Sequence, residues 1–160
     1  MLRRDLLAVM PGIALLGVAG AASAKDAKQD EEAIRKLVHT ELEGGQAHDI
    51  DKVMSVYWNS KDFVLFDPGP KVVRGYDALK EAWTAYFKVF SKAEATLDEL
   101  HVGASGDVGY AMSLQTWTFY KSDGTSRKDE HRVTNIYRKI DGRWVCILES
   151  DAVPVDMKVL

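Results

Sequence analysis

The stretch Phe63-Val64-Leu65-Phe66-Asp67-Pro68-Gly69-Pro70, followed by Val72-Val73-Arg74-Gly75, marks the point where this chain leaves its core. Four consecutive apolar residues, two of them Phe, indicate a buried strand. Pro68 has no backbone N–H to donate, so the strand ends there and Asp67 is its last residue. The sequence therefore predicts a short strand, a Pro-Gly-Pro turn and a second short strand at Val72-Val73.

Asp67 has two interpretations. An acid held against apolar walls is a candidate for a shifted pKa, and groups of this kind transfer protons. Asp before Pro-Gly also commonly opens a turn, because its side chain accepts a hydrogen bond from the backbone two residues on. The local pattern favours the turn, so the surrounding elements must decide whether Asp67 also faces a pocket.

The first 24 residues have the features of a secretory signal peptide. Arg3-Arg4 form a basic head, an apolar run extends from Leu6 to Ala22, and Ala22-Ser23-Ala24 is a typical cleavage site. The Arg pair fits general export and the twin-arginine route alike. We therefore expect cleavage after Ala24, a periplasmic or secreted location, and one mature domain over residues 25–160.

Composition excludes several classes of function. The formal net charge is −3 and no basic cluster occurs, so we expect no nucleic-acid partner and no membrane contact after signal removal. The single cysteine, Cys146, lies in an apolar run and is expected to be a buried, inert thiol. His39 and Glu43 have helical spacing but no evident third ligand, and no phosphate-binding loop follows a strand, so we expect no metal and no cofactor.

Apolar periodicity predicts three helices. The first begins near Asp30 and ends at Gly44-Gly45, and Asp49 is a good N-cap for a second helix that carries Tyr57 on its apolar face. Gly75-Tyr76-Asp77 opens the third helix. Its apolar positions repeat with full helical spacing and are Leu79, Ala82, Trp83, Tyr86, Phe87 and Phe90.

After Lys92 the period changes to two, which predicts strands near 94–103, 107–120, 127–139 and 143–152. Ser122-Asp123-Gly124 and Asp141-Gly142 are hairpin signals. Helices followed by an antiparallel meander indicate an α+β domain, with the helices covering one face of a curved sheet.

This order of elements, with its landmarks, resembles the nuclear transport factor 2-like superfamily, which includes the SnoaL-like polyketide cyclases and ketosteroid isomerase. The matching motifs span nearly the whole mature chain. They are His48–Val53, Phe66-Asp67-Pro68-Gly69, Arg74–Leu79, Arg132–Arg138 and Asp141–Trp144.

The resemblance implies a cone-shaped domain, in which a curved antiparallel sheet and three N-terminal helices covering its concave face enclose a pocket. It implies that Asp67 matches the acid with which the isomerase moves a proton beside a carbonyl. Asn135 falls near the isomerase's second acid, and its amide can still donate to a ligand oxygen. The chain departs from the family in three places, with Asn135 in place of the isomerase's second acid, His39-Thr40-Glu41 where the isomerase has Tyr, and Ser150 where many relatives have His.

Strand alternation places His131 and Asn135 on one face, together with Val133 and Tyr137. If this face lines the pocket, His131 is a natural acid–base partner for Asp67. The alternative places His131 at the charged start of its strand, partly in water. Asn135 in mid-strand needs hydrogen-bond partners, and a ligand or a pocket water is one way to supply them.

Glu149 and Asp151 share a face of the last strand, where they either flank a ligand or lie in solvent. Tyr57, Trp83, Tyr86 and Trp117 belong to the core or line a cavity between helix and sheet.

Three functions follow as hypotheses. The first is an exported domain whose apolar pocket binds a small hydrophobic or carbonyl-bearing molecule. The second is a cofactor-independent isomerase, lyase or hydratase with Asp67 as general base and His131 or Asn135 stabilising the oxyanion. The third is a structural or partner-binding domain, and an isologous homodimer through the outer sheet face is the expected assembly.

Overall fold

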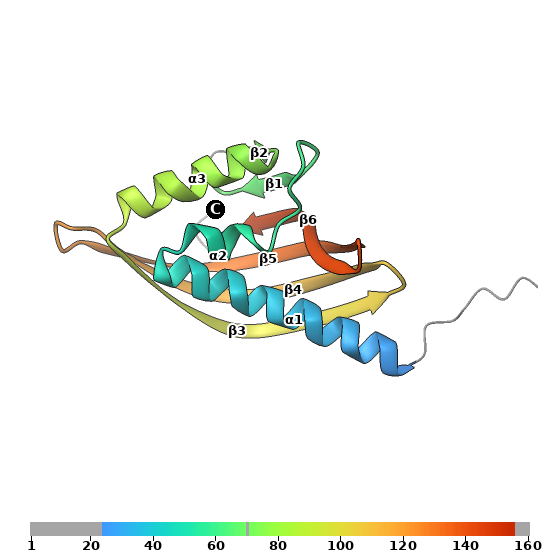
Figure 1. The fold of residues 1–160 in the computed structure, drawn as a ribbon. Helices are drawn as coiled ribbons and strands as arrows, with labels where there is room; N and C mark the ends of the chain where they lie inside the picture. The colour runs from blue at the N-terminus through green and yellow to red at the C-terminus, as the bar shows by residue number, and fades with distance from the viewer. Residues whose placement is uncertain (1–23, 70, 156–160) are drawn as a thin grey trace, which may run out of the picture.

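A six-stranded curved sheet and three helices make up the computed structural model, which describes residues 24–69 and 71–155 (Figure 1). The helices are α1 (Ala24–Ala47), α2 (Ile50–Met54) and α3 (Tyr76–Val89). The strands are β1 (Val64–Asp67), β2 (Lys71–Arg74), β3 (Lys92–Ser105), β4 (Val108–Tyr120), β5 (Ser126–Ile140) and β6 (Arg143–Ala152). This order confirms the α+β prediction and the four long strands. Most of the predicted signal peptide, residues 1–23, lies outside the described part of the chain.

The strand order is β2-β1-β6-β5-β4-β3, and one neighbouring pair departs from the predicted antiparallel pattern. β1 runs parallel to β6, with Val64 opposite Leu148 and Phe66 opposite Ser150. The segment after α2 already runs alongside β6, where Cys146 bonds to Val56 and Trp58 through the backbone at 2.9 Å each. The chain therefore enters the sheet in the direction of its last strand, and the sheet is mostly rather than wholly antiparallel.

Helix α1 is longer at both ends than the predicted helix. It starts at Ala24 and continues through Gly44 and Gly45, although glycine is a poor helix former. A Cβ on Gly44 would lie 2.8 Å from Val53 Cγ2, and one on Gly45 would lie 2.8 Å from the Trp117 ring. The two glycines let α1 approach α2 and the sheet closely, so they are packing residues and not a helix end.

Helix α2 is a single short turn. Asp49 caps it as predicted, accepting a hydrogen bond from the Lys52 backbone at 3.0 Å. The prediction that Tyr57 belongs to this helix is wrong, because α2 ends at Met54 and Tyr57 forms a parallel bridge with Cys146. The bridge places the Tyr57 side chain beside β6.

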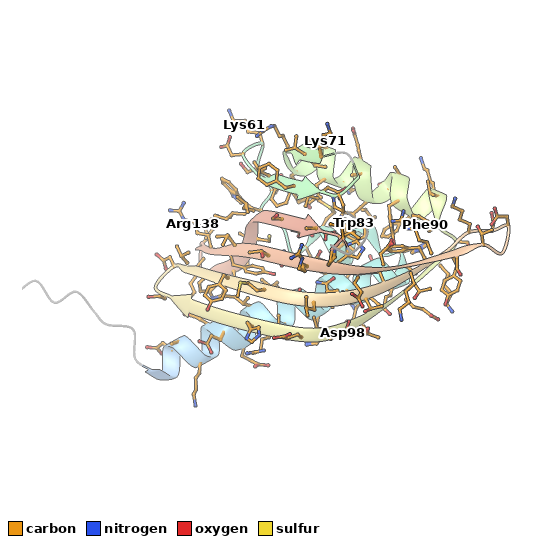
Figure 2. The ribbon with its side chains drawn as sticks, turned by 180° about the vertical axis from the view of Figure 1, so that it is seen from behind. Lys61, Lys71, Trp83, Phe90, Asp98 and Arg138 are labelled. Carbon is orange, nitrogen blue, oxygen red and sulfur yellow. The ribbon has the colours of Figure 1, made fainter. Side chains whose placement is uncertain are left out.

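Helix α3 turns its aromatic face towards the sheet. Figure 2 shows Trp83 and Phe90 on that side of the helix, while Lys61, Lys71 and Arg138 lie at the periphery. On β5 the alternation is confirmed, because His131, Val133, Asn135 and Tyr137 are all buried. The hydrophobic core therefore lies between the helices and the inner face of the sheet. None of the described helices is both long and apolar enough to cross a membrane.

Candidate functional site

The inner face of β5 and β6 carries a group of polar side chains inside the cone. The strand register sets Asn135 opposite Glu149 and Val133 opposite Asp151, so the polar residues of the two strands are neighbours. Glu149 is 6% exposed and Asn135 is 1% exposed. The solvent-exposed alternative for Glu149 is therefore wrong, and the interior that was predicted to be apolar contains buried acids.

His131 and Asp151 form an ion-pair geometry at one end of this face. His131 Nδ1 lies 2.9 Å from both carboxylate oxygens of Asp151, and both side chains are largely buried. With Nδ1 donating to the carboxylate, Nε2 of the neutral ring is an acceptor. Nε2 is buried and has no hydrogen-bond partner among the described residues, and the ring lies edge-to-face with that of Phe119, with centroids 6.3 Å apart. This arrangement fixes the orientation of the imidazole ring and leaves Nε2 in an aromatic environment.

A second group lies deeper and joins α1 to the sheet. The Tyr57 hydroxyl lies 2.6 Å from Glu41 Oε1 and 2.9 Å from Glu149 Oε2. The Asn135 amide donates to the same Glu149 oxygen at 2.8 Å. The sequence left open whether a ligand or a pocket water bonds to Asn135. In the structure its partner is a carboxyl group of the protein.

Burial dominates the electrostatics of this second group. Desolvation raises the pKa of Glu41 to about 7, opposed by the hydrogen bond from Tyr57 and supported by the nearby Asp151 charge. Desolvation also raises the pKa of Glu149 well above its ordinary value, and the adjacent Glu41 adds to this effect. A neutral carboxyl therefore persists here at a pH where ordinary Glu side chains are ionised.

Asp67 lies at the rim of the site. Its Oδ1 accepts a hydrogen bond from the Gly69 backbone at 2.6 Å, which is the turn geometry that the local sequence favours. Partial burial nevertheless raises its pKa, and the charges of Asp151 and His131 act on it. The parallel register that sets Phe66 opposite Ser150 brings Asp67 beside Asp151. The Asn135 amide instead bonds to Glu149 and Cys146.

Aromatic rings separate this interior from solvent at the C-terminal end of α3. Phe119 packs against Tyr86 and Phe90, with centroids 5.3 and 5.1 Å away. Beside it opens a hollow of about 210 Å³, lined by Val89, Phe90, Phe119, Lys121, Thr125, Ser126 and Arg127. Phe119 thus contacts both the hollow and His131.

The other predicted aromatic residues have different surroundings. Trp117 donates from its ring nitrogen to Gln115 at 2.9 Å, and Gln115 in turn donates to Ser113. The Tyr86 hydroxyl is buried and has no hydrogen-bond partner in the described part of the chain. Cys146 is free and buried, as expected. Within the described residues, no group of three or more His, Cys, Asp or Glu side chains is placed to hold a metal ion.

The model of the SnoaL-like domain family matches residues 34–154, which include both polar groups and most of the sheet. The chain belongs to the SnoaL-like domain family. A search of curated proteins found no significant match to this SnoaL-like chain.

Solved structures agree with the family. An NTF2-like protein of unknown function from Pseudomonas putida is 26% identical, covers 83% of this chain and 92% of its own, and superposes with a TM-score of 0.72. A nuclear transport factor 2 superfamily protein from Salmonella enterica is 18% identical, with coverages of 81% and 94% and a TM-score of 0.75. A type 2 hexachlorocyclohexane dehydrochlorinase is 17% identical, with coverages of 80% and 87% and a TM-score of 0.70. These likenesses place the SnoaL-like domain in the nuclear transport factor 2-like superfamily.

Proposed function

We propose that this SnoaL-like domain binds a small molecule between α3 and the inner sheet face, and removes a proton from carbon without a cofactor. The observation that supports it is the His131–Asp151 pair, whose unpartnered Nε2 is buried next to aromatic rings. The fold neighbour named as a dehydrochlorinase carries out an elimination, by its name, on the same scaffold.

In the proposed reaction the His131 Nε2 lone pair takes a proton from a carbon of the ligand. The electron pair of the broken C–H bond forms a new double bond, and a leaving group departs with its own bonding pair. If a carbonyl is adjacent, the pair moves into it instead and an enolate forms. Asp151 holds the ring in the correct tautomer and stabilises the imidazolium that results. Asp67 at the rim is a second acid beside this pair and not the principal base.

A chromogenic probe of base catalysis tests this proposal. In 5-nitrobenzisoxazole, loss of the C–H proton completes a nitrile as the N–O bond breaks, and a coloured phenolate is released. We expect the protein to accelerate this release, and His131→Gln to reduce the rate by about 100-fold or more, the usual contribution of a general base. His101→Gln is the matched control, because His101 is exposed on β3, where it pairs with Glu99. Equal rates for wild type and His131→Gln would contradict the proposal.

We also propose that the protein is exported and assembles as a homodimer through the outer sheet face. Alternate residues of β4 leave large apolar side chains exposed there, Val108, Tyr110, Met112 and Leu114, each 42–54% accessible. A contiguous apolar stripe of this kind is unusual on a monomer, and a second copy offers a matching surface.

Native mass spectrometry of the protein from its exporting cell checks both features. We expect a subunit with the mass of residues 25–160 and a dimer at micromolar concentration. Leu114→Glu places a charge in the stripe and should give monomers. Lys36→Glu changes an exposed position of α1, on the other side of the sheet, and should leave the dimer intact. A wild-type monomer would refute the dimer, and retention of residues 1–24 would refute export.

A further inference from the structure

The Glu41–Tyr57–Glu149 group makes two hydrogen-bond contacts but contains only one hydroxyl proton if both carboxyl groups are ionised. The Tyr57 hydroxyl has a single proton, yet it contacts a carboxyl oxygen on each side, at 2.6 and 2.9 Å. It can donate to one of them only, so the other contact needs a proton that comes from the carboxyl. Two negative oxygens on either side of one hydroxyl would otherwise repel each other in a buried site.

Within residues 24–69 and 71–155, no Lys or Arg forms an ion pair with this group. Among the described residues, the Lys and Arg ion pairs involve other acids, and neither Glu41 nor Glu149 takes part in one. The charge of Asp151 acts on both acids, and the charges of the two acids raise the pKa values of Tyr137 and Cys146 on the surrounding strands. None of these three groups supplies positive charge. A shared proton is therefore the neutralising charge.

Glu41 is the member of the group that is open to a ligand. Its Oε1 contacts Tyr57, while Oε2 takes no hydrogen bond within the described residues, and the side chain keeps some accessible surface. Glu149 is closed in by Tyr57 and Asn135. Asp151 connects the two halves of the site, because it bonds to His131 and its charge also acts on Glu41.

We infer that Glu41 is the proton donor of the site, which delivers the proton shared with Glu149 across Tyr57 to an oxygen atom of the ligand. This inference rests on the proposed function, and it assigns the ligand class as a neutral molecule with a carbonyl, hydroxyl or ether oxygen beside the acidic C–H. When His131 takes the carbon-bound proton, the C–H electron pair forms a new double bond. In a hydroxyl or ether ligand the C–O bond of the neighbouring carbon then breaks with its electron pair on oxygen, whereas in a carbonyl ligand the π pair of the C=O bond moves onto oxygen. In both cases the Glu41 proton neutralises that oxygen. The protein is left with an imidazolium and a carboxylate. The imidazolium then releases its extra proton to solvent, and the carboxylate takes one up.

Infrared spectroscopy detects the shared proton without any ligand. We expect the carbonyl stretch of a neutral carboxylic acid at pH 6, where ordinary Glu side chains are ionised, with a shift in deuterium oxide, because burial raises the pKa of both acids. Glu41→Gln or Glu149→Gln should abolish the band, because Tyr57 can then donate to the one carboxylate that remains. Glu43→Gln is the matched control, since Glu43 is exposed on the same helix and pairs with Lys52. A wild-type spectrum without the band, or a band lost in Glu43→Gln, would overturn the shared proton.

Two benzisoxazoles with different leaving groups test whether Glu41 delivers its proton to the leaving oxygen. The nitro-substituted phenolate departs readily without an acid, whereas the phenolate from unsubstituted benzisoxazole benefits from one. Glu41→Gln should therefore slow the unsubstituted substrate at least 10-fold more than the nitro substrate. Equal slowing of both substrates would overturn the donor role and leave the proposed base intact. If wild type turned over neither substrate, the proposed function would fall and the donor role with it, whatever the infrared band shows.

Discussion

Asn135→Asp is expected to destabilise the protein by about 3–5 kcal/mol at pH 8, the usual cost of an uncompensated buried charge. The Asn135 side chain is 1% exposed, and its amide nitrogen lies 2.8 Å from Glu149 Oε2. A carboxylate at that position would face a second carboxyl with no N–H to donate. The new acid must then either stay protonated or repel its neighbour.

The loss of stability should depend on pH with a definite sign. Burial beside Glu149 should raise the pKa of the introduced carboxyl, so the folded variant binds a proton more tightly than the unfolded chain does. Its stability is therefore retained below the ordinary Asp pKa of about 4 and falls as the pH rises through the folded value. Denaturant unfolding at pH 5 and pH 8 measures the difference. Thr134→Asp is the control, because Thr134 belongs to the other face of β5, and an Asn135→Asp variant as stable as this control at pH 8 would refute the buried cluster.

Local patterns in the sequence predict most of the elements correctly. The change of period after Lys92 indicates the four long strands, and strand alternation places His131 and Asn135 on the inner face. These features depend on neighbouring residues, so a single sequence carries them. The end of α1 cannot be predicted from neighbouring residues, because Gly44 and Gly45 are retained in the helix by contacts with Val53 and Trp117.

The chemistry of the site depends on pairings that are distant in the sequence. Glu41 follows Ile34 by seven residues and Val38 by three, so helical periodicity places this acid on the buried face, and that signal was available. The partners of Glu41 could not be predicted from the sequence in this way. Tyr57 reaches Glu149 only because the segment after α2 pairs with β6, across 92 residues of chain.

Asp67 illustrates the same limit. The Pro-Gly-Pro sequence predicts its bond to the Gly69 backbone, since two residues separate the partners. Its position beside Asp151 and His131 follows from the parallel pairing of β1 with β6, which the local sequence does not encode. Asp67 is therefore a turn residue at the rim, and the base that we propose lies on β5.

Coupling between His131 and Asp151 is the decisive property of the proposed base. If Asp151 acts by orienting and stabilising the imidazole, the two residues contribute to the rate as one unit. The measurement is a double-mutant cycle with His131→Gln, Asp151→Asn and the double variant, read from phenolate release by 5-nitrobenzisoxazole. We predict that His131→Gln is slower than wild type by about 100-fold or more, and Asp151→Asn by about 10-fold. The double variant should be no slower than His131→Gln alone. Rates that multiply independently, or an Asp151→Asn variant as fast as wild type, would contradict a His131–Asp151 base.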